Sequence, residues 1–484
     1  MQFNSYIFIL LFLPVSVIGY FLVNKYSKNK NLGNYYLLAA SVIFYCYAGV
    51  KNSLILLTSV IVNYFLSLQI KKKEKYKKYL LIVALVFNVG LLLYFKYTNF
   101  FVANFNSLFN LDITFKNVIL PLGISFFTFQ QIAYIINIYK NKLNHISFSE
   151  YALFILYFPK LIMGPLIEPD KFIEQIRDEN KKSLNSDNII VGIRMFNIGL
   201  FKKLLLADIF AKAVTWGFSN YEAVSSLDWI IISLSYTFEI YFDFSGYSDM
   251  AIGISKMLNI DLPINFNSPY KSYSMREFWK RWHMSLTNFL TNYIYIPLGG
   301  SKKGKIRTYI NMVLVFVISG IWHGANWTFI LWGLLNGAIC AVERFLGDKT
   351  KNIHNGFKWC MNFTIINLLW LLFRAESITQ WLDIIKRTVS LSNISISSGL
   401  INAFSLPELS IIYKLTGLSY FNNRIYGFTM LAYLLLGFFI VLCFKNTSEK
   451  EYKNTAFSAI VSAILLIWGI LSLGSISTFV YFGF

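Results

Sequence analysis

Long apolar runs, separated by short clusters of basic residues, recur along almost the whole chain of 484 residues. A helix needs about 20 mainly apolar residues to cross the hydrocarbon core of a bilayer. The clearest runs are residues 5–22, 35–50, 53–70, 79–95, 119–139, 229–244, 357–373, 425–444 and 456–473. The pattern predicts an all-α protein that crosses a membrane many times, in a single multi-pass domain of residues 1–484.

The longest uncharged run covers residues 308–342, between Arg307 and Glu343. Its 35 residues are too many for one ordinary span, and Gly320, Gly324 and Asn326 interrupt it. We therefore expect two segments that meet inside the membrane. Residues 151–166 and 189–206 are weaker candidates, because basic residues interrupt them. The expected total is about eleven spans, with some re-entrant or interfacial pieces.

Composition supports a membrane protein. Hydrophobic residues make up 56% of the chain and charged residues 14%, whereas an ordinary soluble domain is about 25% charged. The net charge of +20 is concentrated in short loops such as residues 25–30, 71–78 and 302–307. Such loops are typical of the cytoplasmic side and of contact with anionic lipid, so we expect an extracytoplasmic N-terminus, membrane lipid as a partner and no nucleic acid.

Of the four histidines, His323 lies within the long uncharged run, in the segment SGIWHGANW (residues 319–327). Ionisable residues at membrane depth are costly and usually serve a site. Burial favours the neutral imidazole, which can accept a proton as a general base. The alternative is a structural histidine that hydrogen-bonds a neighbouring helix. His145 and His354 lie in polar loops, where we expect solvated side chains.

His283 lies in a second aromatic-rich segment, SMREFWKRWHMSL (residues 274–286). Seven apolar residues recur there at helical spacing: Met275, Phe278, Trp279, Trp282, Leu286, Phe289 and Leu290. The pattern predicts one basic amphipathic helix at the membrane interface, with His283 at the edge of its apolar stripe. A role at the lipid headgroups and a role in a site are both consistent with that position.

Three carboxylates, Glu239, Asp243 and Asp249, lie in and just after an otherwise apolar run. Glu239 and Asp243 are four residues apart and share one face of a helix. We expect each carboxylate to line a wet cavity or to pair with a cation, and a structural ion pair is the preferred interpretation. The expected cations are Arg276, Lys280 and Arg281.

Seven segments occur in an order that is characteristic of a known family: LPLGISFFTFQ (120–130), FPKLIMGP (158–165), FDFSGYSDMA (242–251), NFNSPY (265–270), FWKRWH (278–283), YIPLGG (295–300) and WHGANW (322–327). With them the chain resembles the membrane-bound O-acyltransferase (MBOAT) family, in its bacterial branch for polysaccharide O-acetylation, the alginate O-acetylation (AlgI) type. The resemblance implies membrane helices around a central funnel. It implies a catalytic core at about residues 35–344, followed by C-terminal membrane helices at residues 345–484.

The resemblance implies that His323 is the essential histidine of the active site and that His283 is its second histidine. His283, Asn326 or Trp322 would stabilise the oxyanion or orient the base, and the sequence leaves these three alternatives open. The predicted supporting or substrate-binding residues are Trp322, Asn326, Trp282, Arg281, Asp243 and Asp249. No metal site and no bound cofactor are expected.

The implied reaction transfers an acetyl group from a cytoplasmic thioester, acetyl-CoA first, towards hydroxyls of an exopolysaccharide or of peptidoglycan. The anionic phosphates of the donor would meet basic loops, including Arg281 and residues 302–305. A partner protein outside the membrane is expected to pass the acetyl group on. One alternative is D-alanyl transfer to teichoic acid from a carrier protein, and another is a non-enzymatic transporter of the donor or of a glycan. The expected location is the bacterial cytoplasmic (inner) membrane.

Overall fold

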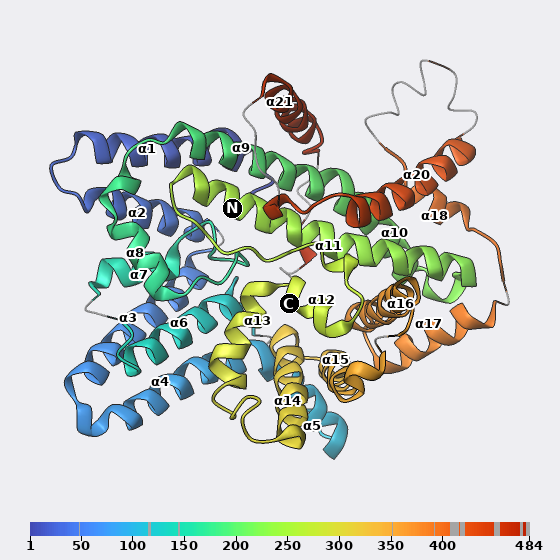
Figure 1. The fold of residues 1–484 in the computed structure, drawn as a ribbon, viewed down its shortest axis with the longest axis horizontal. Coiled ribbons are helices and arrows are strands. Elements are labelled where there is room, and N and C mark those ends of the chain that lie inside the picture. Colours follow the sequence, from blue (N-terminus) through green and yellow to red (C-terminus); the bar gives the residue numbers. More distant parts are fainter. Residues whose placement is uncertain are drawn as a thin grey trace. The chain divides into compact units, whose positions relative to one another are not determined.

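The computed structural model describes residues 1–47, 49–114, 118–143, 146–350, 352–391, 393–406, 416, 422–449, 455–474 and 478–480. All regular elements in these residues are helices (Figure 1), and an isolated β-bridge pairs Phe266 with Trp282. The all-α prediction is therefore confirmed. His145 lies outside the described residues.

The chain divides into two compact units, and the first comprises residues 1–196 and 248–264. Its helices are α1 (Leu13–Tyr26), α2 (Leu32–Cys46), α3 (Val50–Lys72), α4 (Lys77–Leu92), α5 (Thr98–Phe109), α6 (Ile124–Tyr139), α7 (Phe148–Leu156) and α8 (Pro169–Arg177). Buried amides join three of them: Nδ2 of Asn63 on α3 donates to Gln131 of α6 at 2.7 Å and to Asn88 of α4 at 3.2 Å. Polar side chains within membrane helices satisfy one another in this way.

The second unit comprises residues 197–247 and 265–484. Its helices are α10 (Asp208–Ser219), α12 (Met275–Arg281), α13 (Met284–Leu290), α14 (Lys305–His323), α15 (Trp327–Leu346), α16 (Asn355–Arg374), α17 (Ile378–Ser390), α18 (Ser398–Ala403), α20 (Asn422–Cys443) and α21 (Ala456–Leu471). Two longer helices, α9 (Ser186–Phe201) and α11 (Ser226–Met257), contribute residues to both units. The second unit contains both histidines of the predicted site.

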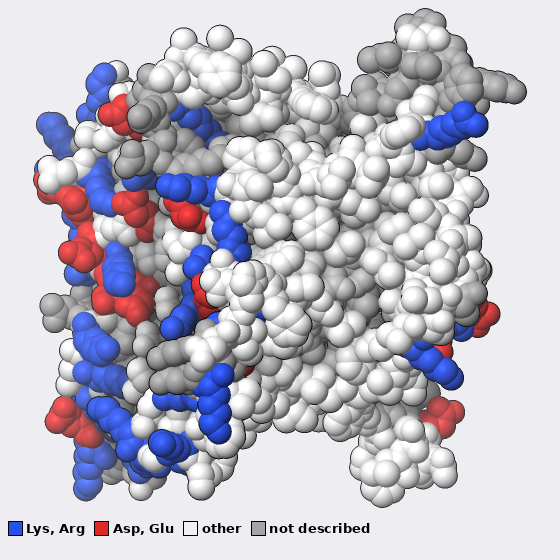
Figure 2. Space-filling view, turned by 45° about the vertical axis from the view of Figure 1, so that its right-hand side comes forward, with Lys and Arg blue, Asp and Glu red and all other residues white. Residues whose placement is uncertain are grey.

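In the part of the chain that the structure describes, seven helical segments are long and apolar enough to cross a membrane: Phe8–Tyr26, Val50–Lys72, Glu74–Phe109, Lys305–His323, Trp327–Leu346, Asn355–Arg374 and Arg424–Cys443. Two shorter apolar helices, Leu32–Cys46 and Ala456–Leu471, accompany them. Figure 2 shows a broad surface without charged side chains, with the charges gathered in separate groups. The chain is thus a multi-pass membrane protein, and the total of eleven spans stays a prediction.

Three expected spans differ from the helices observed. The run at residues 308–342 forms α14 and α15, each long enough to cross by itself, so nothing requires them to meet inside the membrane. The run at residues 119–139 becomes helical only at Ile124, because Gly123, with a φ of +74°, precedes it. The run at residues 151–166 leaves the helix after Leu156, where a turn-rich segment with two prolines follows.

Candidate active site

His323 is the last residue of α14, and only 4% of its surface is exposed. Three aromatic rings surround its imidazole. The ring centroids lie 4.9 Å away for Trp322, 5.3 Å for Trp332 of α15 and 5.2 Å for Phe373 of α16. Three helices therefore build an apolar enclosure around this histidine.

Close packing of α14 on α15 sets the position of His323, and the two helices lie side by side (Figure 1). A Cβ atom on Gly320 would lie 2.2 Å from the carbonyl oxygen of Phe329, and one on Gly333 would lie 2.3 Å from that of Phe316. Small residues of this kind let membrane helices approach each other closely. Gly320, one turn before His323, thus allows the backbone of α15 to approach α14 closely.

His283 lies at a break between two short helices. α12 ends at Arg281 and α13 begins at Met284, and His283 between them has a φ of +45°. A non-glycine residue rarely adopts this left-handed conformation. The prediction of one continuous amphipathic helix is therefore wrong at this point, because the side-chain spacing continues through a turn in the backbone.

Asn265 holds the turn that follows His283. Its carbonyl oxygen accepts a hydrogen bond from the amide of Met284 at 3.0 Å. Its side-chain Oδ1 accepts from the hydroxyl of Ser285 at 2.6 Å and from the amide of Ser285 at 3.3 Å. The NFNSPY segment thus fixes the backbone that presents His283.

The apolar stripe of α12 and α13 is buried in the protein. All seven of its members are less than 10% exposed: Met275, Phe278, Trp279, Trp282, Leu286, Phe289 and Leu290. His283 itself is 1% exposed, so it does not lie at the level of the lipid headgroups. Burial lowers the pKa of His283 to about 3, and the imidazole is neutral at physiological pH.

Trp322 contacts both histidines. Its ring centroid lies 4.9 Å from that of His323 and 6.4 Å from that of His283, and Phe244 of α11 meets the His283 ring edge-on at 4.7 Å. Trp282 packs against Trp370 of α16 at 4.9 Å. The structure therefore brings together His283, His323 and Trp322, as the sequence predicts.

Helix α15 holds α12 in place beside the histidines. The two carboxylate oxygens of Glu343 accept from the amides of Met275 and Arg276, at 2.7 and 3.0 Å. The indole N–H of Trp279 donates to Oδ1 of Asn336 at 3.0 Å. One helix thus positions both histidines, since α15 also packs directly on α14.

Two further predicted residues already have partners. Asn326 caps α15 by accepting from the amide of Thr328 at 3.1 Å, and it donates to the carbonyl oxygen of Glu376 at 2.9 Å. Arg281 binds Glu277 at 2.7 Å. These contacts favour positioning as the role of Asn326.

Asp243 pairs with Lys203, at 2.7 Å, and the same lysine binds Asp208 at 2.9 Å. The expected pairing with a cation of α12 is therefore wrong, because the neighbouring helical segment supplies the lysine. Lys203 lies in a π-helical turn, Lys202–Ala207, a local distortion that often occurs at functional sites. The signal in the sequence was a lysine within an apolar run. Asp249 is buried in the first unit.

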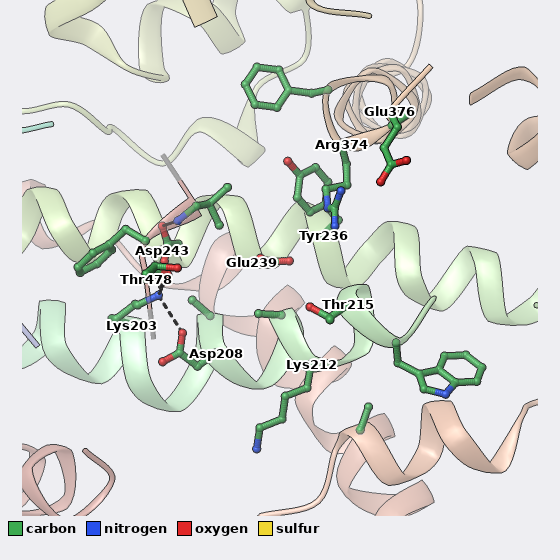
Figure 3. A pocket seen from close by; sticks show the side chains of 18 of the residues that line it. Lys203, Asp208, Lys212, Thr215, Tyr236, Glu239, Asp243, Arg374, Glu376 and Thr478 are labelled. Atoms are coloured by element: carbon green, nitrogen blue, oxygen red, sulfur yellow. Dashed lines mark hydrogen bonds and ion pairs between the residues drawn. The ribbon is translucent and has the colours of Figure 1, made fainter. Parts of the chain in front are cut away.

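A cavity of about 1210 Å³ lies in the second unit, lined by residues of α10, α11 and α16 and of the segments around them (Figure 3). Its walls include Glu239 and Asp243, the ion-paired Lys203, and Arg374. Phe373 also lines it, and the same ring contacts His323. Among the described residues, no group of three or more His, Cys, Asp or Glu side chains could hold a metal ion.

The structure thus combines many apolar helices with two buried histidines that contact one tryptophan, as expected of a membrane-embedded protein with an enclosed site. A sequence model of the membrane-bound O-acyltransferase family matches residues 42–374. The chain belongs to this family and is an acyltransferase.

Three relatives place the chain within the family. The peptidoglycan O-acetyltransferase of Helicobacter pylori is 38% identical over 519 aligned positions, which cover 100% of this chain and 97% of the relative. The alginate O-acetylase AlgI of Pseudomonas aeruginosa is 35% identical over 475 positions, covering 96% and 86%. The teichoic acid D-alanyltransferase of Streptococcus thermophilus is 29% identical over 253 positions, covering 49% and 60%.

Proposed function

We propose that the protein moves an acetyl group from a cytoplasmic thioester donor, acetyl-CoA, towards hydroxyls of a cell-surface polysaccharide, with His323 as the general base. The observation that carries the proposal is the buried imidazole of His323 at the end of α14. It contacts Phe373, whose ring also lines a large cavity with charged side chains in its wall. The relatives aligned over nearly the whole chain are named for peptidoglycan and for alginate. The acceptor polymer is accordingly an exopolysaccharide or peptidoglycan.

The proposed reaction needs two proton transfers, one from the acceptor hydroxyl and one to the leaving thiolate. His323 takes the proton of the acceptor hydroxyl as its oxygen attacks the thioester carbonyl. A carbon–oxygen bond forms, the carbon–sulfur bond breaks, and the leaving thiolate receives the proton from the imidazolium. His283 and Trp322 support this step from the same aromatic cluster, and Asn326 positions the start of α15. Arg281 and the exposed lysines at residues 302–305 would meet the phosphates of the donor.

The orientation follows from the ends of the helices. Helix α14 begins at Lys305 with Arg307 in its first turn, and it ends at His323. Basic helix ends favour the cytoplasm, so His323 lies towards the outer face of the inner membrane. By the same rule, the basic residues that follow the span Phe8–Tyr26 favour an N-terminus on the outer side. The acetyl group would therefore cross from the cytoplasmic donor to the outer side.

The decisive variant is His323→Ala. Its control is His354→Ala, because His354 is exposed, caps the start of α16 and lies outside the cavity lining. Loss of a general base lowers the rate by about 10²–10⁴-fold. We expect that fall in the cleavage of radiolabelled acetyl-CoA by the purified protein and a loss of ester from the surface polysaccharide of cells. His354→Ala should retain both the acetyl-CoA cleavage and the ester content of the polysaccharide. Normal cleavage and ester content in well-expressed His323→Ala protein would contradict the proposal.

The relative from Streptococcus thermophilus supports a second candidate, D-alanyl transfer from a carrier protein. It covers only half of this chain, so acetyl transfer is the preferred proposal. Supplying a D-alanyl thioester and acetyl-CoA separately to the purified protein distinguishes the two reactions. Thioester cleavage also separates both from a transporter, which moves its substrate across liposomes without breaking a bond.

A partner protein outside the membrane is the further part of this proposal. It would accept the acetyl group at the outer face and pass it to the polymer. Acetylation of a saccharide by the purified chain alone would show that the transfer is direct.

A further inference from the structure

The carboxyl group of Glu239 is buried in the wall of the cavity, on α11. Only 8% of the residue is exposed, and no described residue forms a hydrogen bond with its Oε2. A buried polar atom without a hydrogen-bond partner is energetically unfavourable. Figure 3 shows this carboxyl group among Thr215, Tyr236 and Arg374. The Oε2 atom is therefore available to accept a hydrogen bond from a ligand in the cavity.

Small side chains keep the space beside Glu239 open. The cavity is lined by four small residues: Ala207 of the π-helical turn, Ala211 of α10, and Gly399 and Ala403 of α18. A Cβ on Gly399 would lie 2.4 Å from the indole nitrogen of Trp216, so this glycine leaves room for an aromatic side chain in the wall. The cavity therefore combines open volume with aromatic surface.

Four carboxylates, Glu239 among them, and three cations line the cavity. Lys203 binds both Asp208 and Asp243. Lys212, Arg374 and Glu376 line the same space, and the guanidinium of Arg374 lies 4.5 Å over the ring of Phe218. Without Glu239, three cations face three carboxylates. The cavity thus suits a ligand that is uncharged and rich in hydrogen-bonding groups.

We propose that this cavity binds the hydroxyl-bearing end of an uncharged saccharide, with Glu239 accepting hydrogen bonds from its hydroxyls. Aromatic walls with a few placed polar groups are typical of a small-molecule site, and a site built around hydroxyl contacts discriminates strongly against ligands that lack them. The inference rests on the proposed function, since Phe373 lines the cavity and its ring also contacts His323. A saccharide held there would receive the acetyl group directly, in place of the partner protein of the proposed function. A segment of the partner protein is the alternative occupant of the cavity, and the experiment distinguishes it from a saccharide.

The test measures binding of N,N′-diacetylchitobiose, a neutral disaccharide, to the full chain in detergent by calorimetry. We expect Glu239→Ala to weaken binding at least about tenfold, equivalent to about 1.4 kcal/mol. Glu239→Gln, which keeps one oxygen acceptor, weakens it less. Glu222→Gln, an exposed position outside the cavity, leaves it unchanged. Should Glu239→Ala fail to fold, the comparison of Glu239→Gln with Glu222→Gln decides.

The His323→Ala variant separates this proposal from the proposed function. It should bind the disaccharide as the native chain does while failing to cleave acetyl-CoA. Cleavage that depends on His323, without any disaccharide binding at millimolar concentration, would overturn the saccharide site and favour a protein acceptor. Equal binding by Glu239→Ala and the native chain would also overturn it. Binding that depends on Glu239, without cleavage that depends on His323, would refute the proposed function alone.

Discussion

The two histidines lie against the same tryptophan but are held by different kinds of backbone. His323 ends a regular helix of 19 residues, which is fixed by glycine-mediated packing on α15. His283 occupies a left-handed turn between two helices of seven residues, and hydrogen bonds that Asn265 accepts hold that turn. Helix packing thus positions the imidazole of His323, whereas a strained turn held by hydrogen bonds positions that of His283.

The two histidines therefore differ in the backbone strain that their positions require. Strained conformations persist only where the surroundings over-determine them, and they concentrate at functional sites. The strain at His283 orients an aromatic residue without disturbing the seven buried apolar side chains of its segment. The end of α14, in contrast, presents His323 in a regular helical conformation without any local cost. Three changes test this comparison.

The largest effect is expected at the helix packing that places His323. In Gly320→Ala the new methyl group would lie 2.2 Å from the backbone oxygen of Phe329, so α14 and α15 must separate. Overpacking of this kind costs about 1–3 kcal/mol, and we expect the upper end because the contact is with backbone. Thermal unfolding in detergent measures the loss of stability, and acetyl-CoA cleavage should fall with it.

Gly90→Ala on α4 is the matched control, since a Cβ there meets nothing within 4 Å. Alanine is favoured over glycine in a helix by about 0.5–1 kcal/mol, so this variant should unfold at the same or a higher temperature. An equal loss of stability in both variants would show that close packing of α14 on α15 does not set the position of His323.

The second effect concerns the charge of His283. Its pKa is lowered to about 3 by burial, whereas an unfolded histidine titrates near 6.5. As the pH falls from 6.5 towards 3, the unfolded state binds a proton at this histidine and the folded state does not. The free energy of unfolding therefore decreases over that pH range. Between pH 7 and pH 5 we expect the native chain to lose about 2 kcal/mol more than His283→Gln. An identical pH response of His283→Gln and the native chain would contradict the burial of His283.

Much of the fold can be predicted from the sequence because apolar runs and their interruptions are local signals. The uncharged run at residues 308–342, broken near Gly324, gives α14 and α15. Pro121 and Gly123 shorten the run at residues 119–139 for an equally local reason. The helix lengths, however, depend on the charged flanks, which is why α14 and α15 each reach spanning length.

The site was predictable where one residue conflicts with its surroundings. An imidazole within an apolar run marks His323, and carboxylates in a span mark Glu239 and Asp243. The partner of Asp243 was not predictable, because Lys203 is 40 positions away and reaches it only through the packing of two helical segments. The break at His283 was hidden as well, since the apolar spacing of Met275–Arg281 continues into Met284–Leu290 across the turn.

The smallest effect separates the two histidine positions most directly. At position 283 the positive φ penalises any side chain, so His283→Gly should be more stable than His283→Ala by about 1 kcal/mol. At position 323 the backbone is helical, and His323→Ala should be more stable than His323→Gly by about 0.5–1 kcal/mol. Both pairs lose the same imidazole, so the difference within each pair reports the backbone alone. Unfolding temperatures of the four variants measure the two differences, and the same sign at both positions would remove the distinction between a strained and a relaxed histidine.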